Sequence, residues 1–198
     1  MSAKPRIIGL AGTNGSGKDT VGQILADKHN YLFVSVTELL RAEAERRGLP
    51  VERENLRMIS AEWRRESGLG VLIDKAVAEF EPVKAKYSGL VMASLRNPGE
   101  ADRVHELGGT MVWVDADPRI RYDRIQANAA ARGRAKEDAK TFEQFQAEEA
   151  AEMNKPADGD AASLNMSGVK SRCDAFINND SSDMASLALK IQPLAKDS

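Results

Sequence analysis

The sequence predicts an α/β fold in which a parallel sheet of about five strands lies between two layers of helices. Two observations lead to this prediction. Short apolar, β-branched segments without strict alternation recur along the chain, as expected for strands that are covered on both faces. Segments with helical periodicity separate them, so each strand can be followed by a crossover helix. At 198 residues the chain is expected to form one domain, residues 1–198.

The first half of the chain alternates between these two kinds of segment. Val21, Ile24 and Leu25 recur at helical spacing, the Thr37 hydroxyl can cap a helix, and a Gly-Leu-Pro sequence at 48–50 can end it. The elements predicted here are a strand over 6–10, a helix from Gly17, a strand over 31–36, a helix from Thr37, and two helices over 52–67 and 72–80.

The second half repeats the alternation. Asn97-Pro98-Gly99 breaks the chain, Glu100 is expected on the solvated face of a short helix, and Asp117 caps a helix with Pro118 in its first turn. The elements predicted here are strands over 90–94, 110–115 and 174–178, helices over 100–107, from Asp117, over 141–151 and over 183–191, and a loop over 152–170.

Composition excludes several classes of protein. Lysine plus arginine number 28 against 30 acidic residues, and this formal net charge of −2 argues against a nucleic-acid partner. No apolar run approaches the ~20 residues that cross a bilayer, and no secretory signal is evident. Cys173 is the only cysteine, so no internal disulfide can form. We expect a cytoplasmic protein, monomeric or homodimeric, without a membrane partner.

A glycine-rich loop follows the first predicted strand. Gly12-Thr13-Asn14-Gly15-Ser16-Gly17-Lys18 matches the P-loop pattern G-x-x-x-x-G-K between a strand and a helix. The glycines let backbone N–H groups turn toward phosphate oxygens, and the helix N-terminus favours an anion. Lys18 can reach the β- and γ-phosphates of ATP. The residues expected to bind ATP here are Gly12, Asn14, Gly15, Ser16, Gly17, Lys18, Asp19 and Thr20.

The position after Lys18 departs from the pattern. Asp19 stands where a serine or threonine usually gives its hydroxyl to Mg²⁺, and Thr20 follows it. A carboxylate is a strong Mg²⁺ ligand, but it repels a triphosphate when no metal is present. We therefore predict Asp19 and Thr20 as the metal ligands, and nucleotide binding that depends strictly on Mg²⁺.

Several further segments make the chain resemble adenylate kinases and related nucleoside monophosphate kinases. Residues 35–41 look like the start of their acceptor-binding region, which implies that Thr37, Glu38 and Arg41 contact the acceptor, and Arg96 is similar to their second acceptor arginine. Arg124, Arg132 and Arg134 resemble lid arginines that act on the transferred phosphate. Residues 173–180 look like the ending shared with dephospho-coenzyme A kinases, which implies that Asn179 lies beside the donor base.

This resemblance implies a three-layer P-loop kinase fold with a helical acceptor-binding insertion near 37–85 and a small lid near 126–141. The implied activity is Mg²⁺-dependent transfer of the γ-phosphoryl group of ATP to a nucleoside monophosphate-like acceptor. One feature is missing. The third strand of these kinases ends in a metal-associated aspartate, whereas Met92, Ala93 and Ser94 stand here, so Asp19 is expected to supply that charge.

Two other functions stay open. Dephospho-coenzyme A kinases carry an Asp-x-Asp after strand two that includes a base for the acceptor hydroxyl, and Ser35-Val36-Thr37 stands at that place. An acceptor phosphate is already anionic and needs no base, so the missing pair favours a phosphate acceptor, with Glu38 as a displaced base in the alternative. The third candidate is a nucleotide-binding regulatory NTPase without kinase activity.

Overall fold

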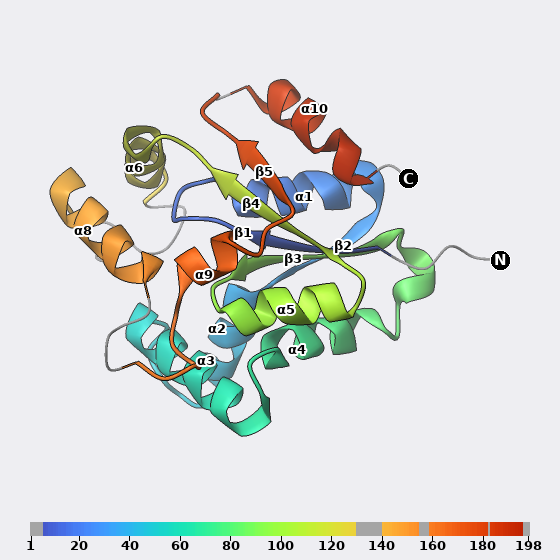
Figure 1. The fold of residues 1–198 in the computed structure, drawn as a ribbon, viewed down its shortest axis with the longest axis horizontal. Helices are drawn as coiled ribbons and strands as arrows, with labels where there is room; N and C mark the ends of the chain where they lie inside the picture. Colours follow the sequence, from blue (N-terminus) through green and yellow to red (C-terminus); the bar gives the residue numbers. More distant parts are fainter. Residues whose placement is uncertain (1–5, 130–139, 155–158, 182, 196–198) are drawn as a thin grey trace.

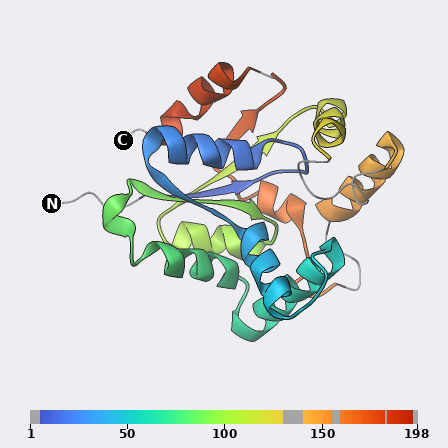
Figure 2. The same ribbon diagram turned by 180° about the vertical axis from the view of Figure 1, so that it is seen from behind.

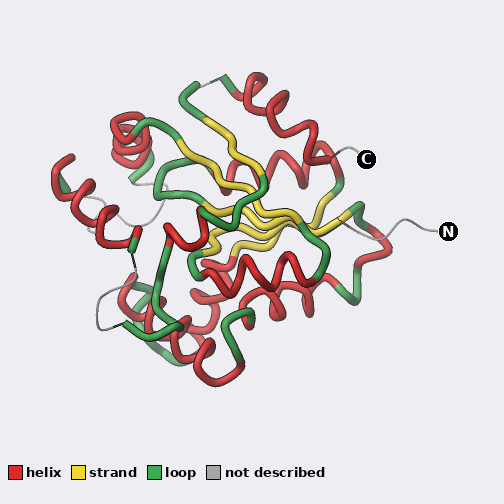
Figure 3. Tube along the Cα trace, viewed as in Figure 1, coloured by secondary structure: helices red, strands yellow, loops and turns green. Residues whose placement is uncertain are grey.

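The computed structural model describes residues 6–129, 140–154, 159–181 and 183–195. Its five strands form one parallel sheet in the order β2-β3-β1-β4-β5, so the predicted fold class is confirmed (Figures 1 and 3). The strands are β1 (Arg6–Ala11), β2 (Tyr31–Ser35), β3 (Gly89–Leu95), β4 (Thr110–Asp115) and β5 (Ala175–Asn178). Every residue of β3 is buried, which explains why its sequence does not alternate.

Helices cover both faces of the sheet, as Figure 1 and the reverse view in Figure 2 show. One apolar cluster joins the sheet to α1 (Lys18–His29) and α10 (Met184–Ala195). The other cluster joins the opposite face to α2 (Val36–Arg46), α3 (Arg53–Ser67), α4 (Val71–Phe80), α5 (Pro98–Glu106) and α9 (Met166–Lys170). The remaining described helices are η1 (Lys84–Lys86), α6 (Pro118–Ala127) and α8 (Phe142–Met153).

The strand order decides where a ligand can bind. The chain leaves β1 at the centre of the sheet, crosses to β2 at one edge and later returns to β4 on the other side of β1. Loops after β1 therefore diverge from their neighbours at the carboxyl ends of the strands. In open α/β sheets this is the place where ligands bind.

Two helix starts differ from the prediction. The helix after β2 begins at Val36 with Ser35 at the N-cap, so the predicted Thr37 cap is wrong, and the Thr37 side chain is left to face the cavity described below. The helix after β3 begins at Pro98 rather than Glu100. The Asn97 side chain caps it and Glu100 completes a capping box, which makes the supposed break a helix start.

The prediction for Glu100 is also wrong. Its side chain is fully buried and accepts hydrogen bonds from the Arg64 guanidinium, with Nη2 at 2.6 Å, and from the backbone N–H of Arg96. Arg64 is buried too, and it also donates to the carbonyl of Ala162 at 3.0 Å. This buried ion pair joins α3 to the start of α5.

The segment over 152–170 is not a loop throughout, because α8 runs to Met153 and α9 occupies Met166–Lys170. The final helix extends beyond the predicted end, to Ala195. The predicted lid over 126–141 lies mostly outside the described residues. Within the described part of the chain, no helix has the length and apolar character that a membrane span requires.

Candidate active site

The loop between β1 and α1 has the backbone that its glycines predict. Gly15 and Gly17 have φ of 79° and 90°, in the left-handed region that favours glycine. Gly17 is also the N-cap of α1, and no side chain of the described residues caps that helix. The Ser16 hydroxyl is buried, and none of the described residues offers it a hydrogen-bond partner. A loop with an uncapped helix start and an orphaned buried hydroxyl fits a phosphate ligand.

A chain of two hydrogen bonds links Lys18 through Thr13 of the loop to the end of β4. Its Nζ donates to the Thr13 carbonyl at 3.4 Å, and the Thr13 hydroxyl donates to Asp115 at the end of β4, at 3.3 Å. Asp115 also accepts from the Trp113 indole N–H at 3.1 Å. Asp115 therefore acts as a positioning residue for the loop, a role that the sequence analysis did not assign to it.

The residue after the last strand, Asn179, contacts the same loop. The Asn179 side-chain amide follows β5 and donates to the carbonyl of Ser16 at 2.9 Å. A Cβ on Gly17 would lie 2.4 Å from that Asn179 nitrogen, so only glycine fits there. The structure thus places Asn179 beside the phosphate loop, 163 residues away in sequence from Ser16.

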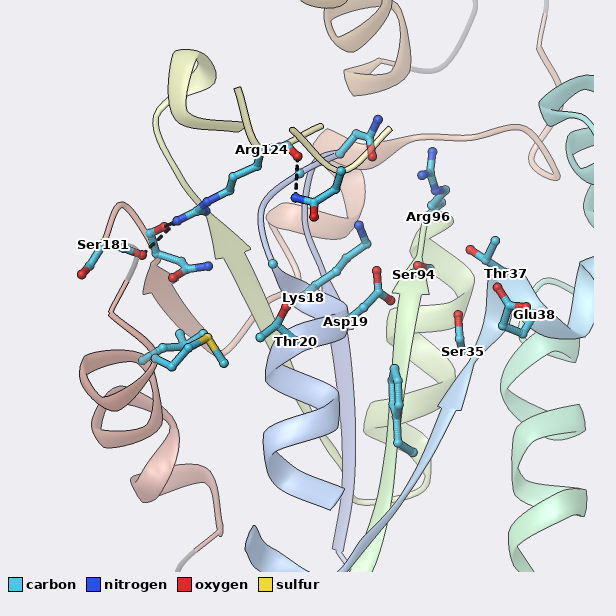
Figure 4. A pocket seen from close by; sticks show the side chains of 18 of the residues that line it. Lys18, Asp19, Thr20, Ser35, Thr37, Glu38, Ser94, Arg96, Arg124 and Ser181 are labelled. Atoms are coloured by element: carbon cyan, nitrogen blue, oxygen red, sulfur yellow. Dashed lines mark hydrogen bonds between the residues drawn. The ribbon is translucent and has the colours of Figure 1, made fainter. Parts of the chain in front are cut away.

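A cavity of about 750 Å³ extends from this loop toward α2 (Figure 4). Lys18, Asp19 and Thr20 face it from α1, while Ser94 and Arg96 face it from the end of β3. Twelve of the predicted site residues line it: Asn14, Gly15, Gly17, Lys18, Asp19, Thr20, Thr37, Glu38, Arg41, Arg96, Arg124 and Asn179. The residues predicted to bind ATP and those predicted to bind the acceptor therefore line one cavity.

Two of the described site residues, Ser16 and Gly12, do not line this cavity. Ser16 is buried. A Cβ on Gly12 would lie 2.1 Å from the Val114 carbonyl oxygen, so Gly12 lets the backbone of the loop pack closely against β4. Arg132 and Arg134 lie outside the described residues.

Arg124 is engaged in a way that the sequence did not indicate. Its Nη2 donates to the carbonyls of Asn179 and Ser181 at 2.8 and 2.9 Å, so it fixes the loop after β5 (Figure 4). Its Nη1 is buried, and among the described residues it has no hydrogen-bond partner. Arg124 is thus placed at the donor end of the cavity.

The acceptor side carries more arginines than the two predicted. A smaller cavity of about 70 Å³ adjoins the first and shares Thr37, Arg41, Ser94 and Arg96 with it. It is also lined by Arg53, Arg57 and Arg64 of α3 and by Glu152 of α8. Burial acts to raise the pKa of Glu152, but Arg96, Arg57 and Arg53 outweigh it and lower that pKa.

Ser94 stands where the missing third-strand acid would be, and its backbone is unusual. It has φ of 73°, and the pairing of β1 with β3 skips it, since Leu10 pairs with Ala93 and Ala11 with Leu95. This bulge turns the Ser94 side chain toward the cavity. Other lining residues that the sequence analysis missed are Phe33, Ser35, Asn128, Ser181, Asp183, Met184 and Leu187, which carry no recognisable motif.

The residues around Asp19 are compatible with a magnesium ion that is bound together with a nucleotide. Among the described residues, no three histidine, cysteine or acidic side chains form a cluster that could hold a metal alone. Mg²⁺ commonly takes one or two protein ligands, with phosphate oxygens and water completing the octahedron. Asp19 and Thr20, adjacent at the mouth of the loop, offer that number of oxygen ligands.

Comparison with known proteins extends these observations. The family described as an AAA domain matches residues 8–151, from β1 to α8. A UPF0200 protein of Hyperthermus butylicus is 31% identical over 155 residues, which cover 77% of this chain and 79% of the relative. The chain belongs to the UPF0200 family. A UPF0200 protein of Pyrobaculum aerophilum is 28% identical over 187 residues, covering 93% and 94% of the two chains.

Solved structures similar to this UPF0200 protein include two shikimate kinases. That of Bacteroides thetaiotaomicron has a TM-score of 0.58 at 16% identity, covering 96% of this chain and 97% of its own. That of Acinetobacter baumannii, in complex with shikimate, has a TM-score of 0.53 at 15% identity, covering 96% and 93%. At these identities the likeness concerns the fold. The UPF0200 protein thus has a P-loop kinase-like fold.

Exchanging the two proposed metal ligands separates their roles. We expect Asp19→Ala to lose most of the Mg²⁺ dependence of ATP binding, because the carboxylate that repels the free triphosphate is gone. Thr20→Ala, its matched neighbour, should keep that dependence. Calorimetric titration of ATP with Mg²⁺ and with EDTA measures both. Equal behaviour of the two variants would contradict the assignment of Asp19.

Proposed function

We propose that this UPF0200 protein transfers the γ-phosphoryl group of ATP to a small acceptor that carries a phosphate group, such as a nucleoside monophosphate. One observation carries the proposal: a single cavity of about 750 Å³ joins the phosphate loop to Arg41 and Arg96 at its other end. Hydrolysis of ATP would require only the part of the cavity beside the phosphate loop. Cationic side chains at both ends, Lys18 at one and Arg41 and Arg96 at the other, favour transfer between two anionic substrates.

The residues of the chain have distinct parts in this reaction. The loop amides and Lys18 hold the donor phosphates, and the Lys18 ammonium offsets the charge that develops on them. Arg41 and Arg96 orient the acceptor phosphate, which suits the paired donors of guanidinium groups. Asp19 and Thr20 would hold a magnesium ion, which when bound supplies further neutralisation of the phosphate charge. Arg132 and Arg134 remain proposed as residues that act on the moving phosphoryl group.

The groups around the acceptor end support a phosphate rather than a hydroxyl as nucleophile. Ser35, Thr37 and Ser94 line this part of the cavity, and none of them is a base. Glu38 is the displaced base of the alternative, but its side chain is 67% exposed and lies 3.3 Å from Arg41 Nε. Glu38 is thus engaged with Arg41 at the solvent boundary, and an acceptor that is already anionic, which needs no base, fits better.

A panel of acceptors tests the proposal. The protein is incubated with ATP and Mg²⁺, and separately with each nucleoside monophosphate, dephospho-coenzyme A and shikimate, while ADP and phosphorylated product are measured. Transfer to one nucleoside monophosphate is the expected result. Transfer to dephospho-coenzyme A or shikimate would overturn the choice of acceptor. Hydrolysis at the same rate with every compound would overturn transfer itself.

A further inference from the structure

Two arginines on the acceptor side converge on one carboxylate of the chain itself. Glu152, near the end of α8, accepts from Arg96 Nη1 at 2.8 Å through one oxygen and from Arg57 Nη2 through the other. The Glu152 side chain is only 16% exposed. Arg96 also lines the main cavity, so this carboxylate lies at the boundary between the main cavity and the smaller one.

The charges around Glu152 do not balance. The Glu152 carboxylate pairs with two guanidinium groups. In the same cavity wall Arg64 pairs with Glu100, and Arg53 shares Glu148 with Lys140. Arg41 pairs with the exposed Glu38, and its Nε is buried without a hydrogen-bond partner among the described residues. This part of the site therefore has one more positive charge than Glu152 can neutralise. A dianion would match it better than a carboxylate does.

The helix that carries Glu152 is anchored along its length. Within α8, all of whose residues are described, Phe145 is the one buried side chain, and it packs near the rings of Tyr122 and Phe142. Met153 packs against the core, and Glu149 pairs with Arg121, whose side chain is only 4% exposed. Separating such a pair is costly, so we expect α8 to stay in place. Glu152 is the next-to-last residue of α8, and a change of its side-chain rotamer is enough to withdraw the carboxylate.

The Glu152 carboxylate stands where a phosphate group would meet both guanidinium groups. The smaller cavity beside it measures about 70 Å³. Apolar side chains of α2, α3 and α4 line it together with the arginines, namely Leu40, Leu56 and Leu72. A phosphate group can take both of these arginine contacts only if the Glu152 carboxylate leaves.

We propose that Glu152 is an internal competitor of the acceptor. Its carboxylate occupies a phosphate subsite between Arg57 and Arg96, and a phosphate monoester binds there by displacing that carboxylate. Only the statement that this ligand is the acceptor rests on the proposed function. Glu152 then acts as a specificity residue, because a dianionic phosphate can replace its charge and a neutral alcohol cannot.

The test is a titration with inorganic phosphate by calorimetry. The phosphate loop is first saturated with Mg²⁺ and a non-hydrolysable ATP analogue, so that phosphate reports on the acceptor side. We expect Glu152→Gln to bind phosphate roughly tenfold more tightly than the unmodified protein, the effect of weakening one charge-assisted contact. Glu143→Gln, an exposed position on the same helix, is the control and should leave the affinity unchanged.

A second substitution shows where the phosphate binds. Adding Arg57→Ala to Glu152→Gln should remove the gain, because Arg57 is one of the two subsite donors. Unchanged or weaker phosphate binding by Glu152→Gln would overturn the inference and make Glu152 a structural clamp. If the ATP analogue does not bind the unmodified protein, the proposed function fails. The phosphate titration without analogue then still decides the inference through the difference between Glu152→Gln and Glu143→Gln.

Discussion

Lys18→Ala is expected to lower the rate of phosphoryl transfer by roughly three orders of magnitude or more. Lys18 is 5% exposed and stands between the phosphate loop and the acceptor arginines. Its charge is needed most when negative charge moves between the two phosphates, and water cannot replace a fixed ammonium in that position. Turnover is measured with ATP, Mg²⁺ and the acceptor that the panel identifies.

Lys28→Ala is the matched control for this experiment. Lys28 belongs to the last turn of the same helix, is exposed and does not line the cavity, so its variant should keep full turnover. Lys18→Arg retains the charge with a longer, planar group and should restore only part of the rate. Turnover by Lys18→Ala equal to that of Lys28→Ala would reject the proposed mechanism.

Arg64→Ala is expected to destabilise the protein by about 3–5 kcal/mol, the usual cost of leaving one member of a buried ion pair without its partner. Arg64 and Glu100 are 3% and 0% exposed. The variant would leave the buried Glu100 carboxylate and the carbonyl of Ala162 without the hydrogen bonds that Arg64 donates to them. Urea unfolding, followed by circular dichroism, measures the free energy of unfolding.

The neighbouring residue provides the comparison. Arg65 also forms an ion pair, with Asp160, but its side chain is 58% exposed. Arg65→Ala should therefore change the free energy of unfolding by at most about 1 kcal/mol. If the Arg64 and Arg65 variants unfold at the same urea concentration, the buried pair does not stabilise the fold as we argue.

The sequence was sufficient to predict the sheet because the information is local. Each strand is a short apolar run, and the glycine loop identifies which strand lies at the ligand-binding edge. The phosphate loop, Asp19, Thr20, Arg41 and Arg96 all meet in one cavity, as their positions after strand ends predict.

What the sequence could not predict depends on contacts between distant segments. Glu100 has the spacing of a capping box with Asn97, which was a usable signal, but nothing local shows that Arg64 lies opposite it. The convergence of Arg57, Arg96 and Glu152 joins three separate elements, so each residue alone resembles an ordinary surface charge. The bulge at Ser94 is equally hard to predict, because serine rarely adopts a positive φ.

The hydrogen bond from Asn179 to Ser16 has a consequence for the order of events during synthesis. The Ser16 carbonyl in the glycine loop waits for its donor, because the Asn179 amide is added 163 residues later. A nascent chain that has not yet paired β5 with β4 lacks this contact. The phosphate loop can therefore take its full set of contacts only after the fifth strand has joined the sheet.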